Sequence, residues 1–272
     1  MNINKQQGMS LVELMIASFL GVLLTMAVIN IFTITNRTAS QSDGLSQAQE
    51  TGRFVAGFLS DAISVAGFSG DNSTNPIQPH AELCADPNNP DACTINRDNG
   101  VGDRITVVRR IFEDNDLDCA GSSFNVAAGV DDVVVDAFWV EADGNNSGDL
   151  YCLTYDFNTR APYDNNRAKQ PIASGVIAIH ALYGLSTSYT NTGNRNVSRY
   201  VSAEEVPADS WQRVFSVKIA ALVQSFEDSA ITEKERKFIL LDADPYKLKD
   251  KFSREIFTTT VTRANFSNLA PN

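Results

Sequence analysis

The feature that most constrains this chain is an uninterrupted apolar run near its amino terminus. Residues Leu14–Ile34 are 21 consecutive positions without a charged side chain. At 1.5 Å per residue, a run of about 20 residues matches the roughly 30 Å hydrocarbon core of a bilayer, which predicts a membrane-spanning helix. Secretory signals have shorter apolar cores of about 7 to 15 residues followed by a small-residue cleavage site, so we expect no cleavage after the run.

The remaining composition is that of a globular protein. Hydrophobic residues make up 43% and charged residues 20% of the 272 positions, which argues against a wholly disordered or collagen-like chain. The net charge of -11 argues against general attraction to nucleic acid or to anionic lipid surfaces. We therefore expect one or two folded domains and no basic face that wraps DNA; DNA binding at one end of the molecule stays open.

One acidic residue, Glu13, stands directly before the apolar run. A carboxylate buried in lipid without a partner costs at least ~2.5 kcal/mol, so such a group usually has a counter-charge or a proton. One interpretation is an acid at the membrane edge that snorkels or is protonated. The other is an acid that meets a positive partner in the folded or assembled protein.

Residues 8–17, GMSLVELMIA, resemble the processing site of type IV prepilins. In that family a short hydrophilic leader ends in Gly and is removed on the cytoplasmic side by a prepilin peptidase, which also methylates the new amino terminus. The resemblance implies that Gly8 ends the leader and that Met9 becomes the methylated first residue of a 264-residue mature chain (272 minus 8). Phe is the commoner first mature residue, so Met9 is a departure from the pattern.

The resemblance also gives Glu13 a role, because it holds the fifth mature position, where the family carries its acid. Cleavage creates an ammonium group at Met9, and opposite charges attract far more strongly in an apolar bundle than in water. The resemblance implies that the acid of one subunit meets the amino terminus of its neighbour and sets the axial register of a filament. We expect Glu13 to serve subunit assembly in this way.

Helical spacing continues past the apolar run. Small or apolar residues recur every three or four positions, without a proline, at Leu45, Ala48, Gly52, Val55, Leu59, Ala62 and Ala66. One helix from about Met9 to Ala66 would be ~87 Å long at 1.5 Å per residue. Helix-breaking residues between Gly67 and Pro76 predict its end.

The second part of the chain reads as a β-rich domain. Runs rich in Val, Ile, Phe and Thr occupy 104–112, 133–140, 150–157, 176–183, 214–223, 238–241 and 255–262. The predicted fold is α+β and type IV pilin-like. It has a long amino-terminal helix, of which the first half spans the membrane and the second half packs on an antiparallel β-sheet. The expected divisions are a leader at 1–8, a transmembrane and polymerisation helix at 9–34, an amphipathic extension at 35–66, and a periplasmic globular domain at 67–272.

Three segments of this domain resemble PilW-type minor pilins. They are Gly184 closing residues 181–184, the Trp211–Leu222 strand, and the Ile256–Arg263 strand. The family often ends in an Arg-Asn pair, whereas here Ala264 separates Arg263 from Asn265.

The resemblance implies a minor pilin of the inner membrane, with its carboxy-terminal domain in the periplasm, that enters an extracellular pilus. Its partners would be other minor pilins, the major pilin, a tip adhesin and prepilin peptidase. Its place would be a priming or tip complex that promotes assembly for adhesion, twitching motility or DNA uptake. Two alternatives are a J-type pseudopilin of type II secretion and a membrane-anchored periplasmic binding domain that keeps its leader and never polymerises.

Four cysteines, Cys84, Cys93, Cys119 and Cys152, lie in the second part of the chain. An even number in an exported domain indicates two disulfides, for which three connectivities exist. We favour Cys84 with Cys93 and Cys119 with Cys152. A zinc site is disfavoured because the sequence has no Cys-x-x-Cys pair and no nearby histidine ligands.

The segment Asp143–Asp149 has the composition of a hairpin turn. It also resembles the first half of a calcium loop, but Thr154 stands where a bidentate Glu would complete that loop. His180 lies among apolar residues, where a structural role is expected. With no nucleophile elbow, Walker loop, Rossmann pattern or zincin motif, we predict neither an enzyme nor a cofactor. The basic stretches 109–110 and 234–237 are expected to be solvated faces.

Overall fold

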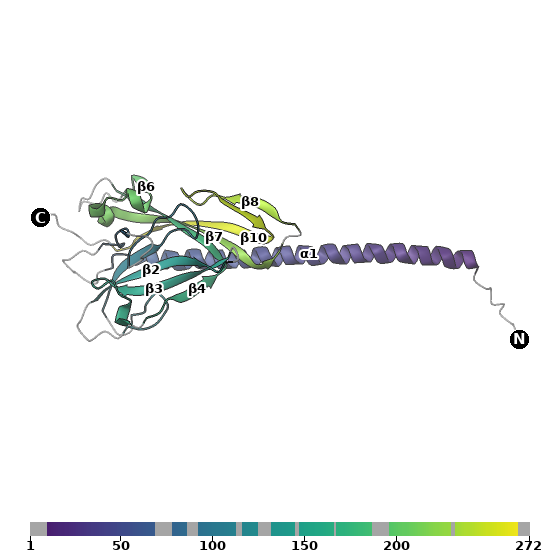
Figure 1. Cartoon of the computed structure of the whole chain (residues 1–272), viewed down its shortest axis with the longest axis horizontal. Coiled ribbons are helices and arrows are strands. Elements are labelled where there is room, and N and C mark those ends of the chain that lie inside the picture. Colours follow the sequence, from purple (N-terminus) through teal and green to yellow (C-terminus); the bar gives the residue numbers. More distant parts are fainter. Residues whose placement is uncertain are drawn as a thin grey trace.

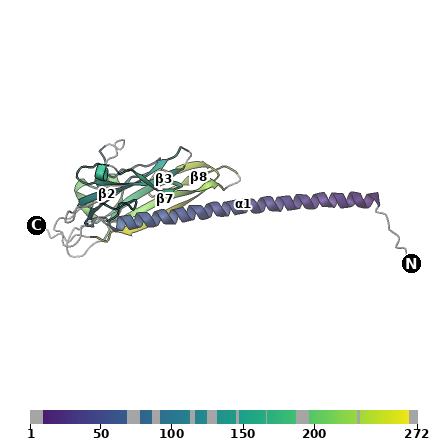
Figure 2. The same cartoon turned by 90° about the horizontal axis from the view of Figure 1, so that it is seen from below.

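The computed structural model describes residues 10–68, 78–85, 92–112, 116–124, 132–144, 147–165, 167–186, 196–229 and 232–265. Figure 1 shows a long helix, α1, whose first part projects from a β-rich domain and whose second part lies along it. The view turned by 90° shows that the domain lies on one side of the helix (Figure 2). The arrangement is the predicted α+β fold.

Helix α1 spans Leu11–Ser64, 54 residues, within two residues of the predicted bounds at each end. At 1.5 Å per residue it is ~81 Å long. Its carboxy-terminal end is followed by Gly67, whose φ of 74° lies in the left-handed region where glycine carries no steric cost. The buried residues recur with helical period and are confined to the second part: Gly44, Ala48, Gly52, Val55, Leu59 and Ile63.

The strands form two four-stranded antiparallel sheets and a separate hairpin. The first sheet has the order β1 (Ile105–Ile111), β2 (Asp132–Ala142), β3 (Gly148–Asp156) and β4 (Gln170–Ser174). The second has the order β10 (Phe252–Thr262), β7 (Val214–Asp228), β5 (Val176–Leu185) and β6 (Arg199–Val201). The hairpin pairs β8 (Lys234–Phe238) with β9 (Tyr246–Asp250). Short 3-10 helices occupy Tyr163–Asn165, Ala203–Glu205 and Ala208–Arg213.

The main core joins the helix to both sheets. Val55, Leu59 and Ile63 of α1 belong to one buried cluster with Phe138 of the first sheet and Ile219 of the second. The side chains of β7 alternate, so Val217, Ile219, Ala221 and Val223 face this core while Ala220 and Leu222 face the other way. The helix extension is therefore a structural part of the domain, as its spacing predicts.

The hairpin of β8 and β9 covers the outer face of the second sheet. Leu240, Ala243 and Tyr246 are buried there against Ala220 and Leu222. The predicted strand at 238–241 is wrong, because β8 ends at Phe238. The apolar residues after it bury Leu240 in the connection between the two strands instead of continuing a ladder.

A buried polar contact fastens the hairpin to the rest of the domain. His180 of β5 has its Nε2 atom 2.6 Å from the Tyr246 hydroxyl of β9, and its Nδ1 atom is 3.4 Å from Oδ1 of Asp103. The other oxygen of Asp103 accepts the backbone N–H of Ala181 at 2.8 Å. Both nitrogens of this histidine thus face partners inside the fold, which supports the structural role expected from its apolar sequence context.

Candidate functional site

The candidate site is the part of α1 that projects from the domain, residues Leu11–Asp43, which we call the projecting segment. Every residue in it is exposed except Thr33, which is half-buried. Its large apolar side chains include Leu24, 68% exposed, and Phe32, 65% exposed. The segment is long and apolar enough to cross a membrane. Because so much apolar surface is unfavourable in water, the segment requires lipid or other apolar helices around it.

Several hydroxyl groups of the apolar part of the projecting segment bond within the helix. Ser18, Thr25 and Thr33 donate to the carbonyl oxygens of Met15, Gly21 and Ile29 at 2.9, 2.8 and 2.8 Å. A hydroxyl that bonds to the carbonyl three or four residues earlier needs no water or external partner. These side chains therefore suit an apolar environment.

Glu13 lies in the first turn of α1. Its Oε2 atom accepts the backbone N–H of Ser10, the residue before the helix, at 3.4 Å. A carboxylate in the first turn also interacts favourably with the positive end of the helix dipole. The side chain is exposed, so it remains accessible to a positive group outside this chain. Gly8 and Met9, the expected cleavage junction, lie outside the described residues.

The rest of the helix, Gly44–Ser64, which we call the packed segment, depends on glycine for close approach. A Cβ atom on Gly52 would lie 2.0 Å from the ring of Phe257 in β10, and one on Gly44 would lie 2.6 Å from Cβ of Ser229. Gly57 has nothing within 4 Å of an added Cβ. Two helix glycines are therefore explained by packing that the sequence alone did not reveal.

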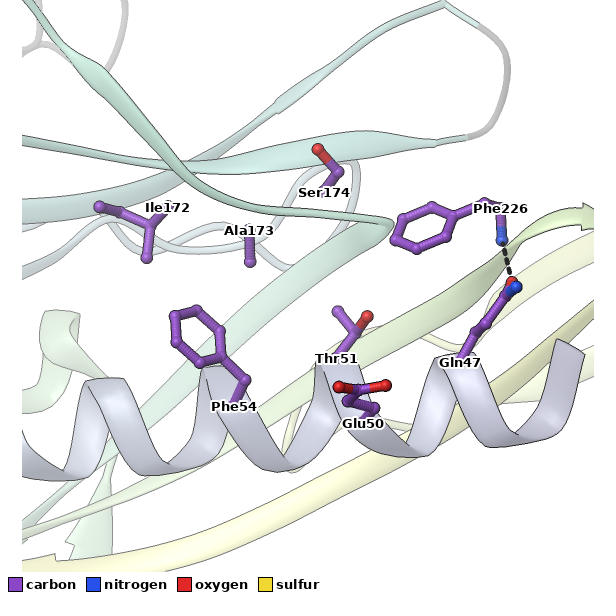
Figure 3. Close-up of a pocket in the computed structure, with 8 residues that line it drawn as sticks. All are labelled: Gln47, Glu50, Thr51, Phe54, Ile172, Ala173, Ser174 and Phe226. Carbon is purple, nitrogen blue, oxygen red and sulfur yellow. Dashed lines mark hydrogen bonds between the residues drawn. The ribbon is translucent and has the colours of Figure 1, made fainter. Parts of the chain in front are cut away.

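A groove of about 380 Å³ separates the packed segment from β4. Figure 3 shows Phe54 of α1 and Phe226 of β7 at its two ends, with Ile172 and Ala173 along the opposite wall. The amide oxygen of Gln47 accepts the backbone N–H of Phe226 at 3.4 Å across it. This contact lies where the helix enters the domain, and it helps to hold the helix at this edge of the two sheets.

The four cysteines form the two favoured pairs, Cys84 with Cys93 and Cys119 with Cys152. Their Cα–Cα separations are 5.3 and 6.1 Å, within the usual range for disulfides. The first pair closes a short loop, and the second ties Cys119 to strand β3.

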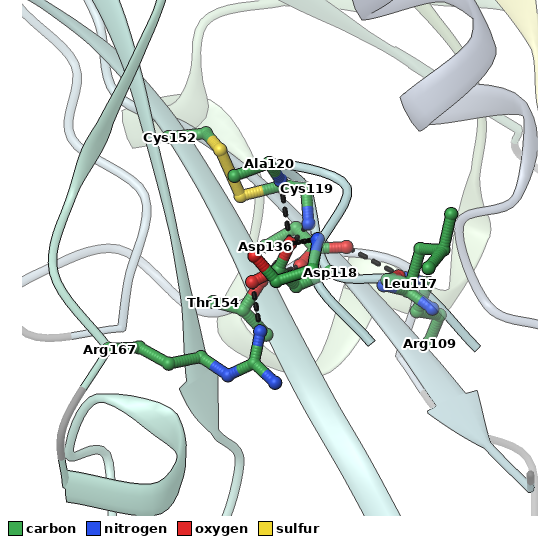
Figure 4. The surroundings of a disulfide bond; sticks show 10 residues. Arg109, Leu117, Asp118, Cys119, Ala120, Asp136, Cys152, Thr154 and Arg167 are labelled. Carbon is green, nitrogen blue, oxygen red and sulfur yellow. Dashed lines mark hydrogen bonds and ion pairs between the residues drawn. A yellow bond between two sulfur atoms is a disulfide. The ribbon is translucent and has the colours of Figure 1, made fainter. Parts of the chain in front are cut away.

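The surroundings of the second disulfide hold its loop in place (Figure 4). The Cys119 backbone N–H donates to the Thr154 hydroxyl at 3.3 Å, and Asp118 pairs with Arg167. Arg109 donates to Asp136 at 2.7 Å on the same side of the sheet. The acidic residue Asp118 also accepts backbone N–H groups of its own loop, so its charge is used within the fold.

The segment between β2 and β3 is a hairpin turn. Its Asp143 accepts the Ser147 backbone N–H on Oδ1 at 3.3 Å, and the Asp143 N–H donates to the Ser147 carbonyl at 2.9 Å. Residues 145 and 146 lie outside the described part. Among the residues that the structure describes, no group of three or more His, Cys, Asp or Glu side chains could hold a metal ion.

His80 is the second buried histidine. Its Nδ1 atom is 2.5 Å from the Thr106 carbonyl oxygen, and its ring packs against Tyr183 and Trp211. Burial lowers the pKa of His80 from 6.5 to about 4, and the nearby Arg263 guanidinium acts in the same direction, against the hydrogen bond to Thr106. The imidazole is therefore neutral at neutral pH and forms part of the core.

Two family models match the sequence. The family described as Type IV Pilus-assembly protein W matches residues 137–265, from within β2 to just beyond β10. The prokaryotic N-terminal methylation motif matches residues 3–29, a range that contains Gly8, Met9 and Glu13. The chain is a PilW-like type IV pilin.

The match to the W family contains the three segments of this pilin that resemble PilW-type minor pilins, among them Gly184 and residues 256–263. A type IV-like pilin from Thermus thermophilus is similar in structure, with a TM-score of 0.46, 12% identity, and coverage of 82% of this chain and 97% of that one. No curated protein matches the sequence.

Proposed function

We propose that this pilin is a minor pilin that prepilin peptidase processes between Gly8 and Met9, and that it acts with other minor pilins in a priming or tip complex. In this proposal residues 1–8 are the leader, 9–34 hold the chain in the inner membrane and later in the filament, and 35–66 join that helix to the periplasmic domain ending at 272. The family match supports a role in pilus assembly.

The observation that carries the proposal is the division of α1 into two segments with opposite surroundings. The projecting segment leaves its apolar side chains uncovered, while the packed segment buries Val55, Leu59 and Ile63 completely. A domain anchor alone explains an apolar helix. The methylation motif at the start of the helix supports a chain that is cut, methylated and then assembled.

Glu13 supplies the electrostatic part of the proposal. Its carboxylate is exposed in the first turn of the helix, so the ammonium group of a processed Met9 in a neighbouring subunit has access to it. The attraction strengthens as the surroundings become apolar, since the effective dielectric constant falls. A correctly staggered neighbour is thereby favoured over one that leaves the carboxylate unpaired among apolar helices.

The test replaces Glu13 with Gln in the full chain and measures subunit recovery in sheared pili and in the membrane fraction. We expect membrane levels to stay normal while recovery in pili falls at least tenfold. The matched control is Glu50→Gln, which removes an exposed acid from the packed segment of the same helix. Normal recovery of the Glu13 variant in pili would contradict the assigned role of this carboxylate.

A further inference from the structure

The outer face of the β8–β9 hairpin differs in charge from the rest of the protein. Between Lys234 and Lys251 there are six basic residues and four acidic ones, a net charge of +2, whereas the remainder of the chain carries -11 minus 2, or -13. Figure 1 shows the hairpin on the side of the molecule opposite β2, β3 and β4. It is therefore a local basic region on an acidic protein.

Alternation along the two strands determines which side chains form this face. Tyr246 is buried, and Phe238 and Leu248 are half-buried against the second sheet. Because successive residues of a strand point to opposite sides, the intervening residues point outward. We call six of the exposed residues the hairpin face: Glu235, Lys237, Ile239, Pro245, Lys247 and Lys249. Lys234, Asp242 and Asp244 of the hairpin are exposed as well.

The register places two lysines of the hairpin face directly opposite each other. Lys237 pairs with Lys247, and like charges at directly opposed positions destabilise a two-stranded ladder. Among the described residues no ion pair involves Lys237, Lys247 or Lys249. Glu235 on the same face stands opposite Lys249, so the two opposed lysines face each other and not an acid. An external anionic group would relieve the repulsion between Lys237 and Lys247.

An apolar side chain stands beside these cations. Ile239 is 62% exposed, more than any other large hydrophobic residue that the structure describes outside the projecting segment. An exposed apolar residue two positions after an exposed lysine suits an interface, in which an apolar centre is desolvated and a polar rim sets specificity.

The position and charge of the hairpin face select the kind of partner. Tyr246 contacts His180 of β5, and His180 pairs with Ala220 of β7. The next β7 residue, Ala221, pairs with Phe257 of β10, whose ring packs on Gly52. Gly52 lies 18 residues beyond Ile34, which is ~27 Å along the helix and well beyond the ~10 Å reach of electrostatics in salt. A bilayer that ends at Ile34 is therefore distant from Lys237 and Lys247, which lie next to Phe238 and Tyr246 in the hairpin. The net charge of -11 repels a polyanion such as DNA.

We infer that the hairpin face docks on an acidic protein surface with an apolar depression, carried by a neighbouring pilus component. This inference rests on the proposed function, since it places the chain among other pilus subunits. Ile239 enters the depression, and Lys237 and Lys247 pair with carboxylates at its edge. The partner's carboxylates relieve the repulsion between the two lysines, so docking and hairpin stability are coupled.

The test places a photo-crosslinking amino acid at position 239 of the full chain in piliated cells, with the same group at Tyr200 on edge strand β6 as control. We expect irradiation to join position 239 to an Asp- or Glu-containing peptide of another pilus protein, identified by mass spectrometry. Lys237→Glu should lower the yield at least fivefold, whereas Lys237→Arg should keep it within twofold. Arg199→Glu, which makes the same charge change on exposed β6, should leave it unaltered.

A second measurement separates docking from folding. Lys237→Glu turns a repulsive pair into an attractive one, so its Tm should equal or exceed that of the unsubstituted chain while crosslinking falls. The inference would be overturned by a lower Tm of the Lys237→Glu variant or by a crosslinking yield that charge reversal does not change. It would also be overturned if position 239 crosslinked only to lipid or nucleic acid, or gave no crosslink. Recovery of the unsubstituted chain in sheared pili is measured in the same cells. If recovery is normal and the crosslink is missing, the docking surface is rejected while the proposed function as a pilin stands.

Discussion

The projecting and packed segments are one continuous helix, yet they are stabilised in different ways. In the projecting segment the hydroxyl groups of Thr25 and Thr33 bond within the helix, and the large apolar side chains are exposed. In the packed segment the side chains at helical spacing fill the main core, and glycine admits the second sheet at close range. The difference shows that the projecting segment suits surroundings outside the chain, whereas the packed segment is part of the core of its own domain.

The largest expected difference between the two segments comes from removing a leucine side chain in each. Leu59 is fully buried and Leu24 is 68% exposed. Leu59→Ala should lower the free energy of unfolding of the domain by about 2–5 kcal/mol, because it removes buried methyl groups and leaves a cavity. Leu24→Ala should leave it unchanged. Thermal unfolding of the full chain in detergent measures both, and equal losses would contradict the division.

A pH series tests the core that surrounds the packed segment. Above pH 6.5 His80 is neutral in both the folded and the unfolded chain. Between pH 6.5 and about 4 the unfolded chain binds a proton that the folded one excludes, so stability falls as pH falls, by up to about 3 kcal/mol in total. Below about 4 this contribution is constant.

The measurement for His80 is the slope of unfolding free energy against pH between 6.5 and 5, above the range where most carboxylates titrate. His80→Asn should flatten this slope even if its absolute stability is lower, because asparagine does not titrate. An unchanged slope in the variant would show that His80 is not the group responsible.

The smallest effects come from two glycines of the packed segment. Gly52→Ala forces a Cβ atom to within 2.0 Å of the Phe257 ring and should destabilise the domain by about 1–3 kcal/mol. Gly57→Ala meets nothing within 4 Å and should stabilise it by up to ~1 kcal/mol through helix propensity. Chemical denaturation of both variants checks the opposite signs; a shared sign would mean that helix propensity or packing alone determines the outcome.

The helix and most strands could be predicted because their signals are local. The uncharged run ending at Ile34 and the three-to-four-residue spacing after it fix α1 to within two residues at each end. Even so, Leu45 on the predicted face is 44% exposed, and the neighbouring Gly44 is buried in its place. Gly44 is buried because it packs against Ser225 and Ser229, which are distant from it in sequence.

The elements that the sequence did not reveal are those whose residues lack an apolar pattern. Strand β4 contains Pro171 and is polar at both ends, and β8 reads as a charged stretch from Lys234 to Lys237. Their formation depends on pairing with β3 and β9 and on the sheet beneath the hairpin. For the candidate site, the sequence locates Glu13 and the apolar helix, but the exposure of that helix and the hairpin face require the three-dimensional arrangement.

The most direct test of the central claim is mass spectrometry of the amino terminus of this subunit recovered from sheared pili. The account predicts a chain of 264 residues (272 minus 8) that begins with methylated Met9, because only the cut places an ammonium group four residues before Glu13. A subunit that is present in the fibres and still carries residues 1–8 would contradict it.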